Sequence, residues 1–104
     1  MDEILALERA ALDRWIRFDP DGYIDLYASE ITYFDPNHEK RGEGLEAVKA
    51  LLAPIKGFKG AIKDVRYEMI APKFQRHGDT VLLTYNLINY GKVGDQPEAL
   101  LNRW

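Results

Sequence analysis

The chain has 104 residues, of which 46% are apolar and 30% charged, and 14 Lys and Arg against 17 Asp and Glu give a net charge of −3. This length supports one domain with one core, and the lack of a basic block disfavours nucleic acid and anionic membranes as partners. Because it has no cysteine, the chain forms no disulfide, thiol nucleophile or Cys-ligated metal site. Its acidic N-terminus contains no signal peptide and no membrane span, so we expect a cytoplasmic protein.

The first part of the chain predicts two helices. Apolar residues recur at helical spacing from about Asp2, a plausible N-cap, to Phe18. Asp19 and Pro20 then supply a second N-cap with proline at the first helical position, which opens a short helix that extends to about Tyr27.

A short strand and a third helix follow. Residues 31–34 (ITYF) form the first β-type run, so Asp35 lies where a strand stops and a cavity could open. After a charged loop and Gly44, residues 45–52 carry an apolar face at 3.6-residue spacing, and this helix is expected to end at Pro54 and Gly57.

The last part of the chain predicts strands. Residues 61–75 alternate between apolar and polar, and Pro72 suits a bend or a sheet edge. After a turn at 77–79, residues 80–90 are apolar on both faces and belong in the middle of a sheet, and 98–104 begin another strand. The order predicts an α+β fold, a curved antiparallel sheet with helices on one face.

Helices on a curved sheet enclose a pocket, and such pockets are typically apolar with a few placed polar groups. Asn86 is informative because it lies within an apolar strand, where a buried amide must find partners. The residues expected to line the pocket are Trp15, Tyr33, Asp35, Tyr67, Thr84 and Asn86.

Two stretches, DPDGYIDLYASEITYFDP (19–36) and RGEGLEAVKALL (41–52), resemble the nuclear-transport-factor-2-like (NTF2-like) superfamily, in particular its SnoaL-like members and steroid Δ-isomerases. The resemblance implies a single domain over 1–104, a cystatin-like cone with three N-terminal helices packed on one sheet face. In that superfamily the sheet usually continues by about one or two more strands, so we expect C-terminal strands to be missing. Its members include isomerases, cyclases, dehydratases, transport factors and non-catalytic binders.

The resemblance also implies site residues. Asp35 matches the carboxylate that the isomerases use as general base, and an ungapped match places Ala11 at the position of their oxyanion-hole tyrosine. Asn102 falls at the position of their protonated acid and could donate one hydrogen bond. Asp35 and Asn102 are therefore the candidate catalytic residues, with Trp15, Tyr33, Tyr67, Thr84 and Asn86 binding substrate and no cofactor implied.

Simpler interpretations remain open. An Asp before Pro commonly caps a turn through backbone N–H groups. The spacing of Asp35, His38 and Glu39 matches no metal-ligand motif, so a solvated loop is expected there and no metal.

The functional hypothesis is a pocket for an apolar or aromatic small molecule, with isomerase- or dehydratase-type general-base chemistry; whether there is turnover is left open. The alternative is a non-catalytic dimerisation or protein-interaction module. A homodimer through the sheet face is expected in either case, because the strands carry apolar residues on both faces.

Overall fold

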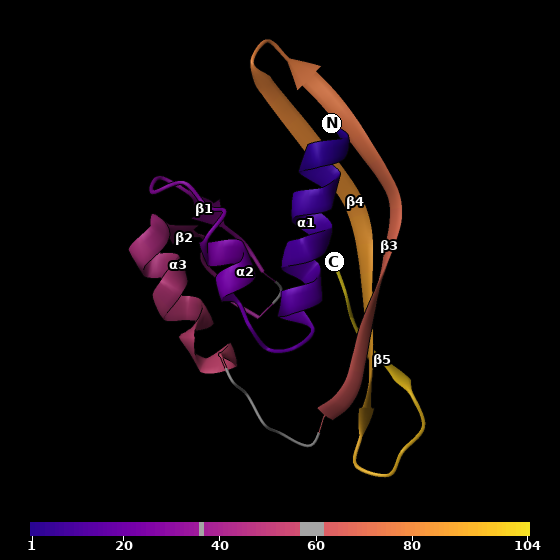
Figure 1. Cartoon of the computed structure of the whole chain (residues 1–104). Helices are drawn as coiled ribbons and strands as arrows, with labels where there is room; N and C mark the ends of the chain where they lie inside the picture. The colour runs from indigo at the N-terminus through magenta and orange to yellow at the C-terminus, as the bar shows by residue number, and fades with distance from the viewer. Residues whose placement is uncertain (36, 57–61) are drawn as a thin grey trace. The chain divides into compact units, whose positions relative to one another are not determined.

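The computed structural model describes residues 1–35, 37–56 and 62–104. Helices come first and an antiparallel sheet last, which confirms the α+β prediction (Figure 1). The predicted boundaries at Gly57 and Ala61, and Pro36 of the Asp-Pro pair, lie outside the described residues. The elements are α1 (Asp2–Trp15), α2 (Asp21–Ile24), β1 (Thr32–Tyr33), β2 (Gly42–Glu43), α3 (Leu45–Leu52), the 3₁₀ turn η1 (Ala53–Ile55), β3 (Ile62–His77), β4 (Thr80–Val93) and β5 (Ala99–Arg103).

The chain divides into two compact units. The sheet unit comprises Met1–Glu8 and Gly60–Trp104, and the helical unit comprises Arg9–Lys59, so that α1 begins in one and ends in the other. Because α2 and α3 belong to the helical unit, the packing of three helices on one sheet face stays a prediction. No helix within residues 1–35, 37–56 and 62–104 has the length and apolar character needed to cross a bilayer.

In the helical unit, α1 ends three residues before the predicted Phe18. Phe18 has a φ of 61°, and the Asp19 N–H bonds back to the Arg14 carbonyl at 3.0 Å, which is the hydrogen bond of a Schellman C-cap. Asp19 Oδ1 then accepts the Asp21 N–H at 3.2 Å, as predicted for an N-cap followed by proline. The helix that it caps, α2, is a single turn and is shorter than predicted.

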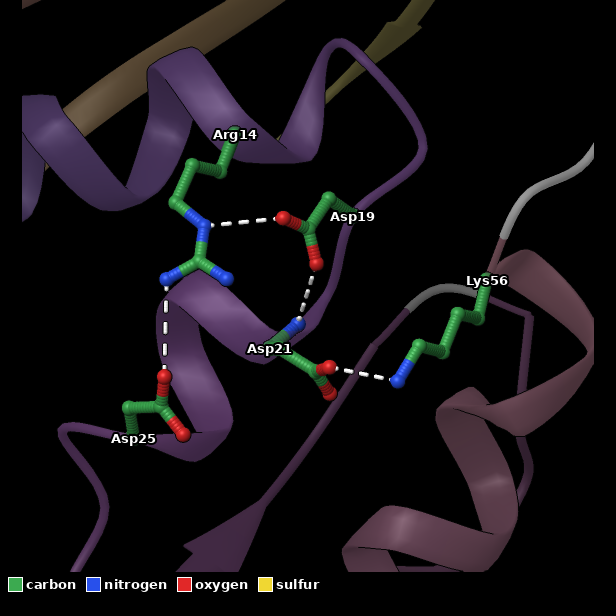
Figure 2. A network of polar contacts seen from close by, with 5 residues as sticks. All are labelled: Arg14, Asp19, Asp21, Asp25 and Lys56. Atoms are coloured by element: carbon green, nitrogen blue, oxygen red, sulfur yellow. Dashed lines mark hydrogen bonds and ion pairs between the residues drawn. The ribbon is translucent and has the colours of Figure 1, made fainter.

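A polar network joins the end of α1 to α2 and to the end of η1 (Figure 2). Arg14 Nε donates to Asp19 Oδ2 at 2.8 Å and Arg14 Nη1 to Asp25 Oδ2 at 3.5 Å, while Lys56 Nζ donates to Asp21 Oδ2 at 2.6 Å. The hydrogen bond from Arg14 lowers the pKa of Asp19 below its usual range, and the contact with Asp21 raises the pKa of Lys56. The network holds the α1–α2 corner at the chain's first change of direction.

The predicted charged loop before α3 contains a strand that the sequence did not indicate. β2 pairs antiparallel with β1, Tyr33 opposite Gly42, and leads directly into α3. Gly42 packs under α3, because a Cβ there would lie 2.9 Å from Leu51 Cδ1. Gly44 has a φ of 85°, which glycine adopts readily, and its N–H bonds the Ile31 carbonyl at 2.8 Å.

In the sheet unit the strand order is β3-β4-β5, which confirms β4 as the central strand. A two-residue turn at Gly78 and Asp79 joins β3 to β4, with Gly78 at a φ of 61°. The register shifts by one residue between Ile70 and Lys73, where Pro72 lies in an edge strand as predicted.

Cross-strand partners share a face, so the register assigns each β4 side chain to one side of the sheet. We call the side that carries Tyr85 the inner face, because the Tyr85 hydroxyl donates to Glu8 Oε1 in the first part of α1. Leu87 and Asn89 also lie on the inner face. The outer face carries Thr84, Asn86, Ile88 and Tyr90, and Arg66 of β3 lies 4.0 Å from the centre of the Tyr90 ring.

Candidate functional site

Asp35 is the centre of a polar cluster at the end of β1. Its Oδ1 accepts the Asn37 N–H at 2.8 Å, which confirms the predicted turn cap. The same oxygen lies 2.7 Å from His38 Nδ1, and the Tyr33 hydroxyl also hydrogen-bonds the carboxyl group. A carboxylate offers about four acceptor positions, so the cap leaves room for the other two partners. Only 4% of the Asp35 side chain is exposed, so these donors replace water around the charge.

Tyr33 and Asp35 lie two residues apart and point the same way, as their alternation on one strand requires. Burial of the phenol raises the pKa of Tyr33 well above its usual value, and the negative charge of Asp35 adds to this effect. Tyr33 therefore stays protonated and acts as a hydrogen-bond donor to the carboxylate.

His38 is held by Asp35 through one ring nitrogen. When Nδ1 carries the proton and donates it to Asp35, Nε2 keeps a free lone pair and can accept a proton. The His38 side chain is 35% exposed, whereas that of Asp35 is almost fully buried. The pair therefore has a buried anionic end and an accessible imidazole end, an arrangement suited to general acid–base chemistry.

A second polar cluster lies on the inner face of the sheet unit. Tyr67, Asn89 and Asn102 are direct cross-strand neighbours on β3, β4 and β5, and we call them the amide row. Asn89 Nδ2 donates to Asn102 Oδ1 at 2.8 Å, and Trp104 Nε1 donates to the same oxygen at 2.9 Å. Asn89 is 4% exposed and is the buried polar residue of the sheet.

The structure places the predicted site residues in several settings. Tyr33 and Asp35 lie together in the helical unit, where the Trp15 ring packs edge-on against Tyr23 with centroids 5.9 Å apart. Tyr67 and Asn102 lie in the amide row of the sheet unit.

Thr84 and Asn86 lie on the outer face, opposite to Tyr67, and both are exposed. The expectation that Asn86 is a buried amide is therefore wrong, because alternation along β4 turns it away from the inner face. The buried amide of this strand is Asn89, three residues further on.

Sequence reasoning missed two residues of these clusters as site candidates. His38 was expected in a solvated loop, although it follows Asp35 by three residues with a proline between them, a spacing that allows a turn to bring the two together. Asn89 was not singled out, although it is the other amide in the same apolar strand.

Neither a surface hollow nor the grouping of possible metal ligands adds a further candidate site in the described part of the chain. A broad, open hollow of about 470 Å³ lies beside the β4–β5 connection, and it is lined by charged and turn residues that include Lys63, Asp64 and Lys92. An ion pair of 3.6 Å between Lys92 and Asp64 crosses it, and none of the predicted site residues lines it. Among the described residues, no three His, Asp or Glu side chains gather as a metal ion would require.

Comparison with known proteins supports the fold. No family model matches the chain. No curated protein matches it either. The chain is similar to the crystal structure of a "putative ketosteroid isomerase" from Parabacteroides distasonis, with a TM-score of 0.65 and 24% identity over 96% of this chain and 81% of that one. At this identity the similarity shows the fold alone: helices followed by a curved antiparallel sheet.

Proposed function

We propose that the chain binds an apolar or aromatic small molecule and moves a proton on it by general-base chemistry, in the manner of an isomerase or dehydratase. The observation that carries this proposal is the 2.7 Å contact between His38 Nδ1 and the buried Asp35 carboxylate. The fold shared with the protein described as a "putative ketosteroid isomerase" supports the choice of a carbonyl compound as the substrate.

The pair divides the work of a base between two groups. His38 Nε2 takes the proton from a carbon next to the carbonyl, and the electron pair of the broken C–H bond moves toward the carbonyl oxygen. Asp35 fixes the ring through Nδ1 and stabilises the imidazolium that forms, while Tyr33 and the Asn37 N–H hold the carboxylate in place. Return of the proton to a different carbon completes an isomerisation.

The experiment measures deuterium uptake from solvent at the carbons next to the carbonyl of a Δ5-3-ketosteroid, together with formation of the conjugated ketone. His38→Gln keeps a hydrogen-bonding side chain that cannot take the proton, so we expect the rate to fall by roughly 100-fold or more. His77→Gln is the matched control, because it removes the other histidine at the exposed β3–β4 turn.

The variants also separate two forms of the mechanism. If Asp35 itself took the proton, Asp35→Asn would abolish exchange while His38→Gln retained most of it. If His38 is the base, His38→Gln is the more damaging change. A wild-type protein that catalyses neither exchange nor isomerisation of this substrate class would refute the proposed chemistry.

The alternative function, a dimerisation module, draws on apolar side chains exposed on the outer face. Leu82 is 48% exposed and Leu100 is 43% exposed, and a second copy of the chain would cover them. Sedimentation at micromolar concentration tests this: a dimer should dissociate in Leu82→Lys and Leu100→Lys. Leu26→Lys, at a similarly exposed position in the helical unit, should leave it intact. A monomeric wild type rejects the dimer.

A further inference from the structure

The amide row contains one buried hydrogen-bond acceptor that no donor in the described part of the chain reaches. Asn89 uses Nδ2 to contact Asn102, and among the described residues no hydrogen-bond donor meets its Oδ1. Buried polar atoms in folded proteins almost always have a partner, since an unpaired one loses its hydration without compensation. An unpaired acceptor on the inner face therefore requires a physical explanation.

The orientation of the Asn89 amide follows from its neighbours. An indole nitrogen can only donate, so the Asn102 atom 2.9 Å from Trp104 Nε1 must be the oxygen. The same Asn102 oxygen lies 2.8 Å from Asn89, so the Asn89 atom that faces it must be the nitrogen. Turning the Asn89 amide over would set two oxygens against each other. Asn89 is therefore locked with Oδ1 as its unpaired end.

We propose that Asn89 Oδ1 accepts a hydrogen bond from a small molecule bound on the inner face of the sheet unit, which therefore carries a neutral hydroxyl or N–H group on an apolar or aromatic body. This inference concerns the sheet unit alone and goes beyond the proton transfer proposed for the Asp35–His38 pair of the helical unit. A carbonyl, ether or carboxylate oxygen at this point would oppose the lone pairs of Asn89 Oδ1 and is disfavoured.

A hydroxyl fits the row better than an N–H group does. Both Asn89 and Trp104 use Asn102 Oδ1, so the Asn102 amide keeps Nδ2 for a further acceptor. The row thus presents an acceptor on Asn89 and a donor on Asn102, and a hydroxyl can both donate and accept. Tyr67, the third member of the row, places an aromatic ring beside them.

The test compares two probes that differ at one group, 2-naphthol and 2-methoxynaphthalene, by calorimetric or fluorescence titration. We expect wild type to bind 2-naphthol roughly 3- to 10-fold more tightly, the effect of one hydrogen bond. Asn89→Leu replaces the amide with an apolar group of similar shape and should remove that preference. Asn86→Leu is the matched control: it makes the same change on the same strand, on the outer face, and should keep the preference.

A second variant keeps the test possible if Asn89→Leu does not fold. Trp104→Phe keeps an aromatic ring but removes the indole donor, which frees the Asn102 amide to rotate and releases the lock on Asn89. The preference for 2-naphthol should then weaken. In the wild type, 2-naphthol should also shift the side-chain amide resonances of Asn89 in a ¹⁵N-labelled sample.

The outcomes separate this inference from the proposed function. Equal affinity of the wild type for both probes overturns the Asn89 subsite and leaves the Asp35–His38 chemistry standing. So does a crystal structure with 2-naphthol bound in which a water donates to Asn89 Oδ1. A preference for 2-naphthol in a protein that catalyses no proton exchange supports the subsite and removes the base. If neither probe binds, the Asn89 subsite is overturned and the Asp35–His38 chemistry is left standing.

Discussion

Gly91 lies on the inner face of the sheet at a position with little room for a side chain. It is buried on β4, two residues after Asn89. A Cβ at this position would lie 2.9 Å from Leu101 Cδ1 and 3.1 Å from Ile62 Cγ2. Val65 Cγ2 would follow at 3.4 Å. Because carbon atoms pack best at about 3.5 to 4.0 Å, an alanine here must displace at least two neighbouring side chains.

We expect Gly91→Ala to lower the free energy of unfolding by about 1 to 2 kcal/mol. Overpacking of a filled site typically costs about 1 to 3 kcal/mol. Alanine also restricts the unfolded chain, which offsets about 0.4 to 1 kcal/mol of that cost. For a chain of this size, each kcal/mol lowers the thermal midpoint by about 4 to 8 °C.

The assay is urea and thermal unfolding of a double-mutant cycle that combines Gly91→Ala with Leu101→Ala. Leu101→Ala removes the Cδ1 methyl group with the shortest contact, so the double variant should be more stable than the sum of the two single changes predicts. A Gly91→Ala protein as stable as the wild type would refute the packing argument. Additive effects in the cycle would show that Leu101 is not the obstruction.

Two further predictions concern pH. Because Arg14 lowers the pKa of Asp19, the ionised carboxylate stabilises the fold above its ordinary pKa of 3.8, and this contribution is lost as the pH falls through the folded-state value. Asn caps as well as Asp does, so chemical denaturation of Asp19→Asn should show reduced stability at pH 7 and a smaller loss on acidification than the wild type or Asp95→Asn. Because the pKa of Tyr33 is raised, the wild type should lose stability as the pH rises above 10.0, where the phenol ionises in the unfolded chain before it does so in the folded one. Tyr33→Phe should lose less over that range, and an identical alkaline profile would contradict burial of the phenol beside Asp35.

Local signals in the sequence predicted most of the elements. The Asp19-Pro20 pair, the Gly78 turn and the apolar run of β4 each act within a few residues, so they can be read without knowledge of the fold. β2 was missed because two residues, Gly42 and Glu43, carry no pattern of their own. Their pairing with β1 is fixed by the return of the chain toward α3.

The faces of the sheet could not be predicted in the same way. Counting back from the two-residue turn in an unbroken register would set Tyr67 opposite Tyr90, on the side of the sheet that carries Thr84 and Asn86. The bulge at Pro72 shifts the pairing by one residue and sets Tyr67 opposite Asn89 instead. A proline signals that a strand is interrupted, but it does not say by how many residues.

The Asp35–His38 contact could be predicted in part: less well than the elements with local signals, and better than the faces of the sheet. The spacing of the two residues matches no metal-ligand motif, so the sequence predicts no metal site there. The contact depends on the path of the turn after Asp35, where the Asn37 N–H bonds back to the carboxylate and brings His38 round to the same oxygen. The sequence predicts that Asp35 caps a turn, but it does not predict where that turn places the His38 side chain.

The two glycines before α3 show how a sequence signature can record architecture without chemistry. Gly42 is required by the closeness of Leu51 and Gly44 by a left-handed backbone, so the path of the chain explains both, although Gly42 lies opposite Tyr33 of the Asp35 cluster. A sequence search with this Arg-Gly-Glu-Gly segment would find proteins that have the same backbone path before α3, whatever reaction they carry out. Relatives that share the proposed chemistry should instead be sought by their residue at the position of His38, and those that share the proposed subsite by their residue at the position of Asn89, because both residues can change while the glycines before α3 stay the same.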